Sequence, residues 1–234
     1  MFNRRQKKVL RNSNKRSLIT ITEPKAPVSE QFRTVRTNIQ FSSVDKEMKS
    51  LLVTSSGPGE GKSTTVSNLA VVFAGQDKKV LLVDADLRKP TVHYTFDLNN
   101  ITGLTNVLTK RTSLDSAYSE TKVPNLYVMS SGPIPPNPAE LLGSKSMLEF
   151  LEEAYKEFDL VLFDTPPVLA VADAQILANQ CEGSMLVVRS GDTEIEQAAK
   201  AKDLLLSTKS KFLGVVLNSK KMEESQYYYY YGKK

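Results

Sequence analysis

Residues 50–65 constrain the fold of this 234-residue chain more than any other segment. The apolar run at 51–53 predicts a buried strand, and a glycine-rich turn follows it directly. Residues 62–64, Lys-Ser-Thr, then open an apolar helix. A strand, a glycine loop and a helix start in this order are typical of a phosphate-binding loop, where backbone N–H groups and the helix N-terminus converge on phosphate oxygens.

The loop predicts a role for each of its residues. Its glycines let the backbone approach an anion, Lys62 is expected to reach the β- and γ-phosphates, and the Ser63 hydroxyl is expected to ligate Mg²⁺. The strict pattern places a glycine where this chain has Ser56, a residue small enough to fit. The alternative, a glycine-rich surface turn, is disfavoured by the flanking strand and helix. The predicted nucleotide-binding set is Gly57, Pro58, Gly59, Glu60, Gly61, Lys62, Ser63 and Thr64.

The rest of the chain predicts a parallel sheet covered by helices on both faces. Apolar runs without polar alternation recur between helical segments, which is the signature of buried parallel strands. Asn137, Pro138 and Glu140 predict a capped helix start, with the helix running towards Lys156. The predicted strands are 79–83, 123–129, 160–163, 185–188 and 213–217, with a short β-like run at 17–22 and further helices at 29–41 and 194–207. The predicted fold class is therefore α/β, a P-loop NTPase fold.

Aspartates follow two of these strands. Asp164 ends an apolar run and fits the residue that holds Mg²⁺ in P-loop enzymes. Asp84 and Asp86 would face the same way if the strand continued through them. Near Mg²⁺ one could join the metal shell and the other accept a proton, and the sequence does not say which. Arg88 could pair with phosphate or with a surface acid.

Composition limits the function classes. The formal net charge is +5, but seven basic residues stand in the first sixteen, so the body carries 24 basic and 26 acidic residues. A nucleic-acid partner is therefore not expected, whereas the basic leader suits an anionic membrane face or an acidic partner, or else is solvated. No apolar run is long enough to span a bilayer and no signal peptide is evident, which predicts a cytosolic protein. The single cysteine, Cys181, excludes an intrachain disulfide and a cysteine metal site.

Two further patterns lie outside the P-loop chemistry. Glu30, Arg33 and Arg36 form a charged stripe on the first long helix, a pattern that is usually a solvated face. The chain ends in a polar segment with five consecutive tyrosines, which cannot all pack into a core. We therefore expect three parts in the chain: a basic leader (1–28), a P-loop domain (29–218) and a tyrosine-rich tail (219–234). The tail tyrosines are Tyr227, Tyr228, Tyr229, Tyr230 and Tyr231.

Taken together, SSGPGEGKST, LLVDADLRKP, LVLFDTPP, SEQFRTVR and the tyrosine tail resemble the bacterial tyrosine kinases of capsule and exopolysaccharide assembly. The resemblance runs from about residue 29 to the C-terminus. It implies ATP and Mg²⁺ as cofactors, Lys62, Asp84, Asp86 and Asp164 as catalytic residues, and Ser63, Asp86 and Asp164 at the metal. It also implies that the charged stripe of Glu30, Arg33 and Arg36 joins subunits into a ring. The tail tyrosines would be autophosphorylated in trans, and Asn218 would contact the adenine base.

The resemblance further implies partners and a location. These are a separate transmembrane activator, a cognate tyrosine phosphatase and protein substrates of polysaccharide assembly, with the kinase peripheral at the inner face of the cell membrane. The alternative is a nucleotide-switch ATPase of the Min or Par type. Those proteins carry a second lysine where this chain has Gly57, and they lack a tyrosine tail. An iron–sulfur carrier of this fold is excluded by the single cysteine.

Overall fold

A seven-stranded sheet forms the centre of the computed structural model, which describes residues 18–42 and 47–221. The strand order is β3-β4-β2-β5-β1-β6-β7, and every neighbouring pair is parallel except β3 with β4. The predicted parallel sheet is therefore confirmed. The strands are β1 (Ser50–Ser55), β2 (Val80–Asp84), β3 (Tyr118–Glu120), β4 (Leu126–Met129), β5 (Leu160–Asp164), β6 (Gly183–Arg189) and β7 (Lys211–Asn218).

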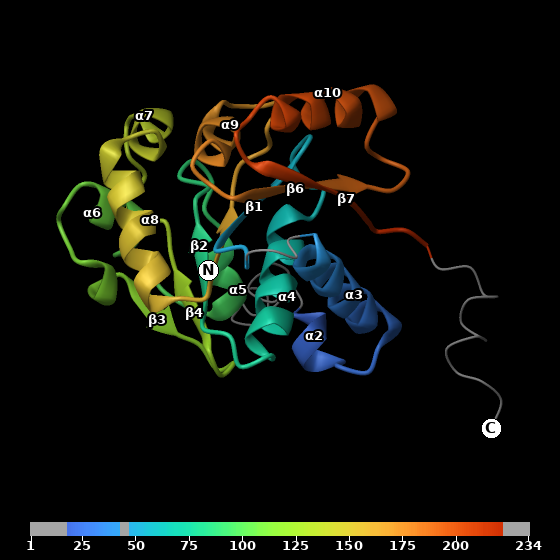
Figure 1. The fold of residues 1–234 in the computed structure, drawn as a ribbon, viewed down its shortest axis with the longest axis horizontal. Coiled ribbons are helices and arrows are strands. Elements are labelled where there is room, and N and C mark those ends of the chain that lie inside the picture. The colour runs from blue at the N-terminus through green and yellow to red at the C-terminus, as the bar shows by residue number, and fades with distance from the viewer. Residues whose placement is uncertain (1–17, 43–46, 222–234) are drawn as a thin grey trace, which may run out of the picture.

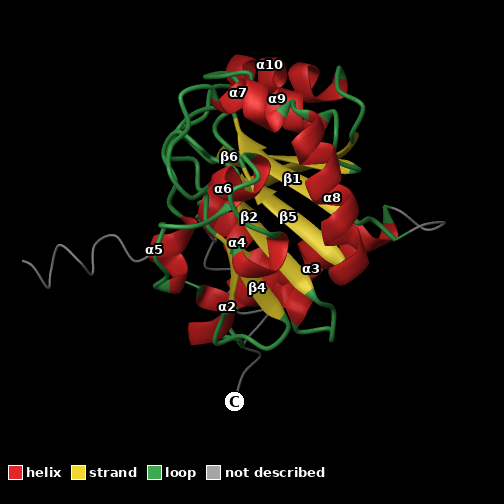
Figure 2. Ribbon diagram, turned by 90° about the vertical axis from the view of Figure 1, so that its left-hand side faces the viewer, coloured by secondary structure: helices red, strands yellow, loops and turns green. Residues whose placement is uncertain are grey.

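Helices cover both faces of this sheet (Figures 1 and 2). One apolar core joins the sheet to α6, α8, α9 and α10, and the other joins it to α3, α4 and α5. The helices are α2 (Ile19–Thr22), α3 (Pro27–Phe41), α4 (Lys62–Ala74), α5 (Val92–Phe96), α6 (Leu104–Leu108), α7 (Pro138–Leu142), α8 (Lys145–Glu157), α9 (Asp173–Ala178) and α10 (Ile195–Leu206), with a 3₁₀ turn η1 at Leu114–Ser116. Among the described residues, no helix is both long and apolar enough to cross a bilayer.

The order of the strands fixes where the functional loops meet. The central strands β1, β2 and β5 are buried along their whole length, as strands covered on both faces must be. Val53 and Asp84 both stand opposite Asp164 in the register. Since these strands are parallel, the loops that follow them emerge at one edge of the sheet, where α/β proteins bind ligands.

Three local predictions were wrong. Residues 17–22 were expected to be β-like, but Ile19–Thr22 is a helical turn. Thr20 explains the difference, because its backbone N–H and its hydroxyl both donate to the Asn68 side chain, at 3.0 and 2.9 Å. This contact with α4 outweighs the strand preference of the β-branched residues.

The helix expected from Asn137 towards Lys156 is two helices, α7 and α8, separated at Gly143 and Ser144. The predicted capping box at Asn137 is also wrong. Asn137 makes no side-chain bond to the helix backbone, and its amide donates instead to the Glu140 carboxylate at 2.6 Å. The basic leader up to residue 17 and the tail tyrosines lie outside the described residues.

Candidate active site

The loop between β1 and α4 has the backbone that the sequence predicted. Gly59 and Gly61 have φ values of 82° and 96°, which favour glycine. A Cβ at Gly61 would also lie 2.0 Å from the Asn218 amide nitrogen. Ser56 does not have a positive φ, and it is buried. The departure from the strict pattern is therefore accommodated without strain.

Glu60 ties this loop to the two loops that follow β6 and β7. One carboxylate oxygen accepts from the Ser56 backbone N–H at 2.8 Å, and the other accepts from the Thr193 hydroxyl at 2.5 Å. The Asn218 amide donates to the Glu60 carbonyl at 2.9 Å. Asn218 thus stands against the phosphate loop, whereas Thr193 was not predicted from the sequence, because no motif marks it.

Lys62 lies among the predicted metal and catalytic residues. Its ammonium is 3.2 Å from an Asp86 oxygen, 3.3 Å from an Asp164 oxygen and 3.2 Å from the Ser63 hydroxyl. Burial disfavours the charged ammonium, but Asp164 and Asp86 outweigh burial and raise the pKa of Lys62. Residues from the phosphate loop, the loop after β2 and the end of β5 therefore converge, as the sequence predicted.

Asp84 and Asp86 do not share one orientation, because β2 ends at Asp84. The Asp84 carboxylate accepts from the backbone N–H groups of Asp86, Thr91 and Val92, at 3.2, 2.8 and 2.9 Å, and so holds the loop after β2. Asp86 accepts from the Lys89 N–H at 2.9 Å and faces Lys62. Extended geometry beyond the strand was the wrong assumption.

The environment of Asp84 changes its acidity. Complete burial, together with the charge of Asp164, raises the pKa of Asp84 to about 7, although the N–H groups of Val92 and Thr91 and the charge of Lys62 act in the opposite direction. A carboxyl group with a pKa near 7 can exchange a proton at neutral pH.

The donor set fits Mg²⁺. Asp164 is fully buried, and one of its carboxylate oxygens has no hydrogen-bond partner among the described residues. Hard oxygens of Ser63, Asp86 and Asp164 surround one cation already, the Lys62 ammonium. No group of three or more His, Cys, Asp or Glu side chains in the described part of the chain is arranged as a complete metal cage. Mg²⁺ does not need one, since it keeps waters and takes ligands from phosphates.

Arg88 forms an ion pair that the sequence left open. Its guanidinium donates twice to the Asp173 carboxylate, at 2.8 and 2.9 Å, and so joins the loop after β2 to α9. Asp173 is fully buried and had no sequence signal beyond its helical context. Phosphate or a surface acid was expected as the partner of Arg88; the observed partner is an acid, but it is buried and not on the surface.

The predicted subunit-contact residues make contacts within the chain. Arg33 pairs with Glu30 and donates to the Pro24 carbonyl at 2.8 Å, and Arg36 donates to the Val72 carbonyl at 2.9 Å. Arg36 therefore ties α3 to α4. Their role between subunits remains a prediction.

Comparison with known proteins defines the class first. A family model described as AAA domain matches residues 48–191. The fold is also that of the septum site-determining protein MinD from Pyrococcus horikoshii, complexed with Mg-ADP. That structure has a TM-score of 0.62 at 20% identity and covers 78% of this chain and 76% of that one. At this identity the similarity shows the fold alone, so the chain has a P-loop NTPase-like fold.

Closer relatives define the family. The chain is 60% identical to the tyrosine-protein kinase YwqD of Bacillus subtilis over 94% of this chain and 92% of that protein. It is 44% identical to the tyrosine-protein kinase CpsD of Streptococcus agalactiae over 81% of both. The crystal structure of the chimerical protein CapA2B2 has a TM-score of 0.84 at 40% identity and covers 88% of this chain and 90% of that one. The chain belongs to the bacterial tyrosine-protein kinases.

Proposed function

We propose that this kinase transfers the γ-phosphoryl group of ATP, with Mg²⁺, to the tyrosines of a neighbouring subunit's tail, and that the transfer regulates capsule or exopolysaccharide synthesis. The observation that carries the proposal is the convergence of Lys62, Ser63, Asp86 and Asp164 at the end of the phosphate loop. Such a site does little covalent chemistry of its own. It positions the reactants and offsets charge.

The phosphate loop holds the nucleotide. Backbone N–H groups of residues 57–64 bind the phosphates, and Glu60 fixes the loop to Thr193 and Asn218. Lys62, which is paired with two aspartates in the nucleotide-free protein, turns to the β- and γ-phosphates. Asn218 is assigned to the base on the family resemblance, and its amide lies against the phosphate loop at Gly61.

Ser63, Asp86 and Asp164 would hold Mg²⁺. When bound, Mg²⁺ would offset negative charge on the phosphate oxygens. The tyrosine oxygen forms its bond to the γ-phosphorus while the bridging P–O bond breaks and ADP leaves. We assign the phenolic proton to Asp84 or Asp86, the two carboxylates at and after the end of β2. Asp84 is fully buried and accepts from three backbone N–H groups, whereas Asp86 faces Lys62.

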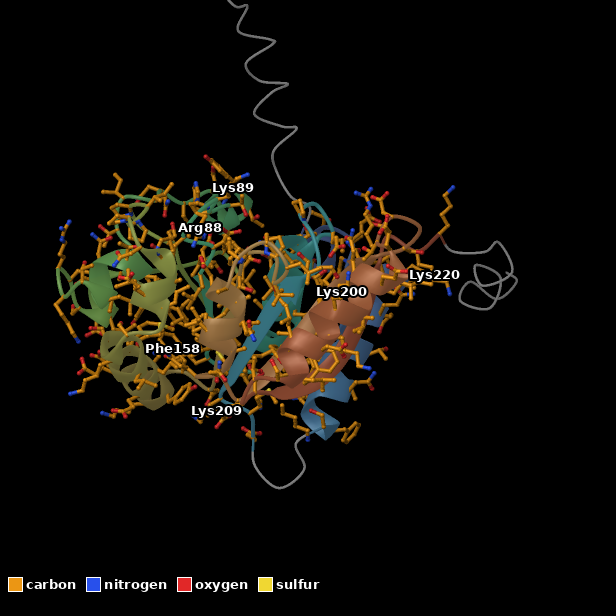
Figure 3. The ribbon with its side chains drawn as sticks, turned by 90° about the horizontal axis from the view of Figure 1, so that it is seen from above. Arg88, Lys89, Phe158, Lys200, Lys209 and Lys220 are labelled. Carbon is orange, nitrogen blue, oxygen red and sulfur yellow. The ribbon has the colours of Figure 1, made fainter. Side chains whose placement is uncertain are left out.

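Transfer between subunits is supported by where the tail begins. In Figure 3, Arg88 and Lys89 mark the loop after β2, and Lys220 lies well apart from them, beyond the end of β7. A tail tethered to one subunit of a ring reaches a neighbour's site at high effective concentration. The stripe of Glu30, Arg33 and Arg36 is proposed to join these subunits. Each phosphate adds roughly −1.5 to −2 charges, so a phosphorylated tail is repelled by the aspartates and the ring loosens.

Partners follow from the same proposal. A separate transmembrane protein activates the kinase and brings it to the inner face of the cell membrane, a cognate tyrosine phosphatase resets the tail, and proteins of polysaccharide assembly are further substrates. The basic leader adds attraction to anionic lipid, at about 1 kcal/mol per basic residue near the surface. The resemblance to capsule and exopolysaccharide kinases supports these assignments.

A mixing experiment tests transfer between chains. A Lys62→Met chain with its five tyrosines serves as substrate for an active chain whose five tyrosines are phenylalanine. We expect phosphotyrosine on the Lys62→Met chain, detected by mass spectrometry. Phosphotyrosine that appears only when one chain carries both Lys62 and the tyrosines would instead establish transfer within a chain.

A further inference from the structure

A groove lies between α3 and β7, next to the point where the described chain ends. Its volume is ≈590 Å³, within the range of sites that bind ligands. Val28, Phe32 and Val35 of α3 form one wall, and Val216 of β7, which packs in the same core as Phe32 and Val35, lies on the other side. Val28 is 37% exposed and the other three are partly buried, so apolar surface remains open in the groove.

The groove is connected to the tail. Ser219, Lys220 and Lys221 belong to its lining, so the described chain ends beside the groove. Figure 1 shows the chain leaving the fold after β7. Ser219 has a φ of 58°, a left-handed conformation that turns the chain after β7. Thirteen residues follow Lys221 in the sequence.

The length of the tail and the chemistry of its tyrosines both fit the groove. Six residues, 222–227, can extend about 20 Å, and the β7 wall from Val215 to Ser219 spans about 13 Å, so the tyrosines can fold back along the whole wall. Tyrosine rings bury apolar area while their hydroxyl groups need a polar partner. The groove supplies such partners in Gln31, Thr34 and Asn218 beside its apolar walls.

We propose that, in the nucleotide-free and unphosphorylated protein, tyrosines of the tail occupy the α3–β7 groove of their own chain. A tethered segment meets this groove at high effective concentration, so binding within the chain is favoured over binding by a second copy. Docked tyrosines are not available to accept a phosphoryl group in an active site. Phosphorylation prevents redocking, because a phosphate would lose its hydration in the apolar groove.

Hydrogen–deuterium exchange of the nucleotide-free full chain tests the docking directly and does not depend on kinase activity. Replacing all five tail tyrosines with serine is expected to speed exchange in residues 27–35 and 213–218 about tenfold, equivalent to losing about 1.4 kcal/mol of protection. Five phenylalanines keep the apolar fit and are expected to preserve most of the protection. Exchange in α10 (Ile195–Leu206) is the internal reference. Equal exchange rates in the serine variant and the wild type would overturn the proposal. Protection that falls when the protein is diluted would also overturn it, because the groove would then be occupied by a second copy of the chain.

A second measurement rests on the proposed function. In a Lys62→Met substrate chain, Val28→Asp places a charge in the groove and is expected to speed phosphorylation of the tail by an active chain severalfold. Ile195→Asp is the matched control, since Ile195 is 88% exposed on α10, and it should leave the rate unchanged. An unchanged rate with Val28→Asp would overturn the withholding of the tail. Absence of any phosphorylation would count against the proposed function, while the exchange result would still decide whether the tail docks.

Discussion

Asp84, Asp86 and Asp164 lie in one small volume but have different surroundings. Asp84 is held by three backbone N–H groups, Asp86 faces Lys62, and Asp164 is fully buried with one oxygen unpartnered among the described residues. Lys62 offsets the charge of two of them. The site is therefore a negatively charged pocket that one lysine neutralises in part, which suits it to a cation and to a polyphosphate held by that cation.

Lys62→Met is expected to lower the rate of tyrosine phosphorylation by two orders of magnitude or more, about the loss seen when one donor to the transition-state charge is removed. The variant should fold, but its melting temperature should fall, because Asp86 and Asp164 lose their partner. Phosphotyrosine formation and thermal unfolding measure the two effects. Lys89→Met, at an exposed position, is the control and should be near normal. Phosphorylation by Lys62→Met at a near-normal rate would remove Lys62 from the mechanism.

The titration of Asp84 predicts a pH dependence of stability. Its pKa is raised from about 3.8 to about 7 on folding, so the protonated carboxyl stabilises the fold. This contribution is complete below pH 4 and is lost as the pH rises to 7. The melting temperature of the nucleotide-free wild type, relative to Asp84→Asn, should therefore fall between pH 5 and pH 8 by a few degrees, at about 2–4 °C per kcal/mol. A difference that is constant over this range would contradict the assignment.

At the scale of elements, the phosphate loop is held in place by the loops after β6 and β7. Thr193→Val removes the hydroxyl bond to Glu60 and is expected to raise the KM for ATP about fivefold, equivalent to one hydrogen bond of ~1 kcal/mol, with little change in kcat. Thr109→Val is the control, because its hydroxyl bonds only within α6 and its C-terminal turn. An unchanged KM for ATP in Thr193→Val would show that the bond does not support the loop.

The two arginines of the α3 stripe differ in what they hold. Arg33→Ala is expected to reduce particle mass in light scattering while nucleotide binding persists, since within the described residues the Arg33 side chain bonds to Glu30 and Pro24 of its own segment. Arg36→Ala should reduce particle mass and also lower the melting temperature, because it loses the bond to the Val72 carbonyl on α4. Full-sized particles from both variants would contradict a role for the stripe between subunits.

At the scale of the whole molecule, the buried runs predicted the sheet because strands covered on both faces cannot alternate with polar residues. The phosphate loop and the aspartates were predicted because parallel strands present their carboxyl ends at one edge. The sequence did not predict Thr193, Asp173 or the helical turn of Ile19–Thr22, since each depends on a partner distant in sequence: Glu60, Arg88 and Asn68. Local propensity carries no information on such contacts.

One measurement tests the central claim most directly. The purified full chain is incubated with Mg·ATP, phosphate release is followed, and the C-terminal peptide is analysed by mass spectrometry. We expect phosphotyrosine within residues 227–231, and none in Lys62→Met. Release of phosphate to water with an unmodified tail would contradict this account and favour a nucleotide switch.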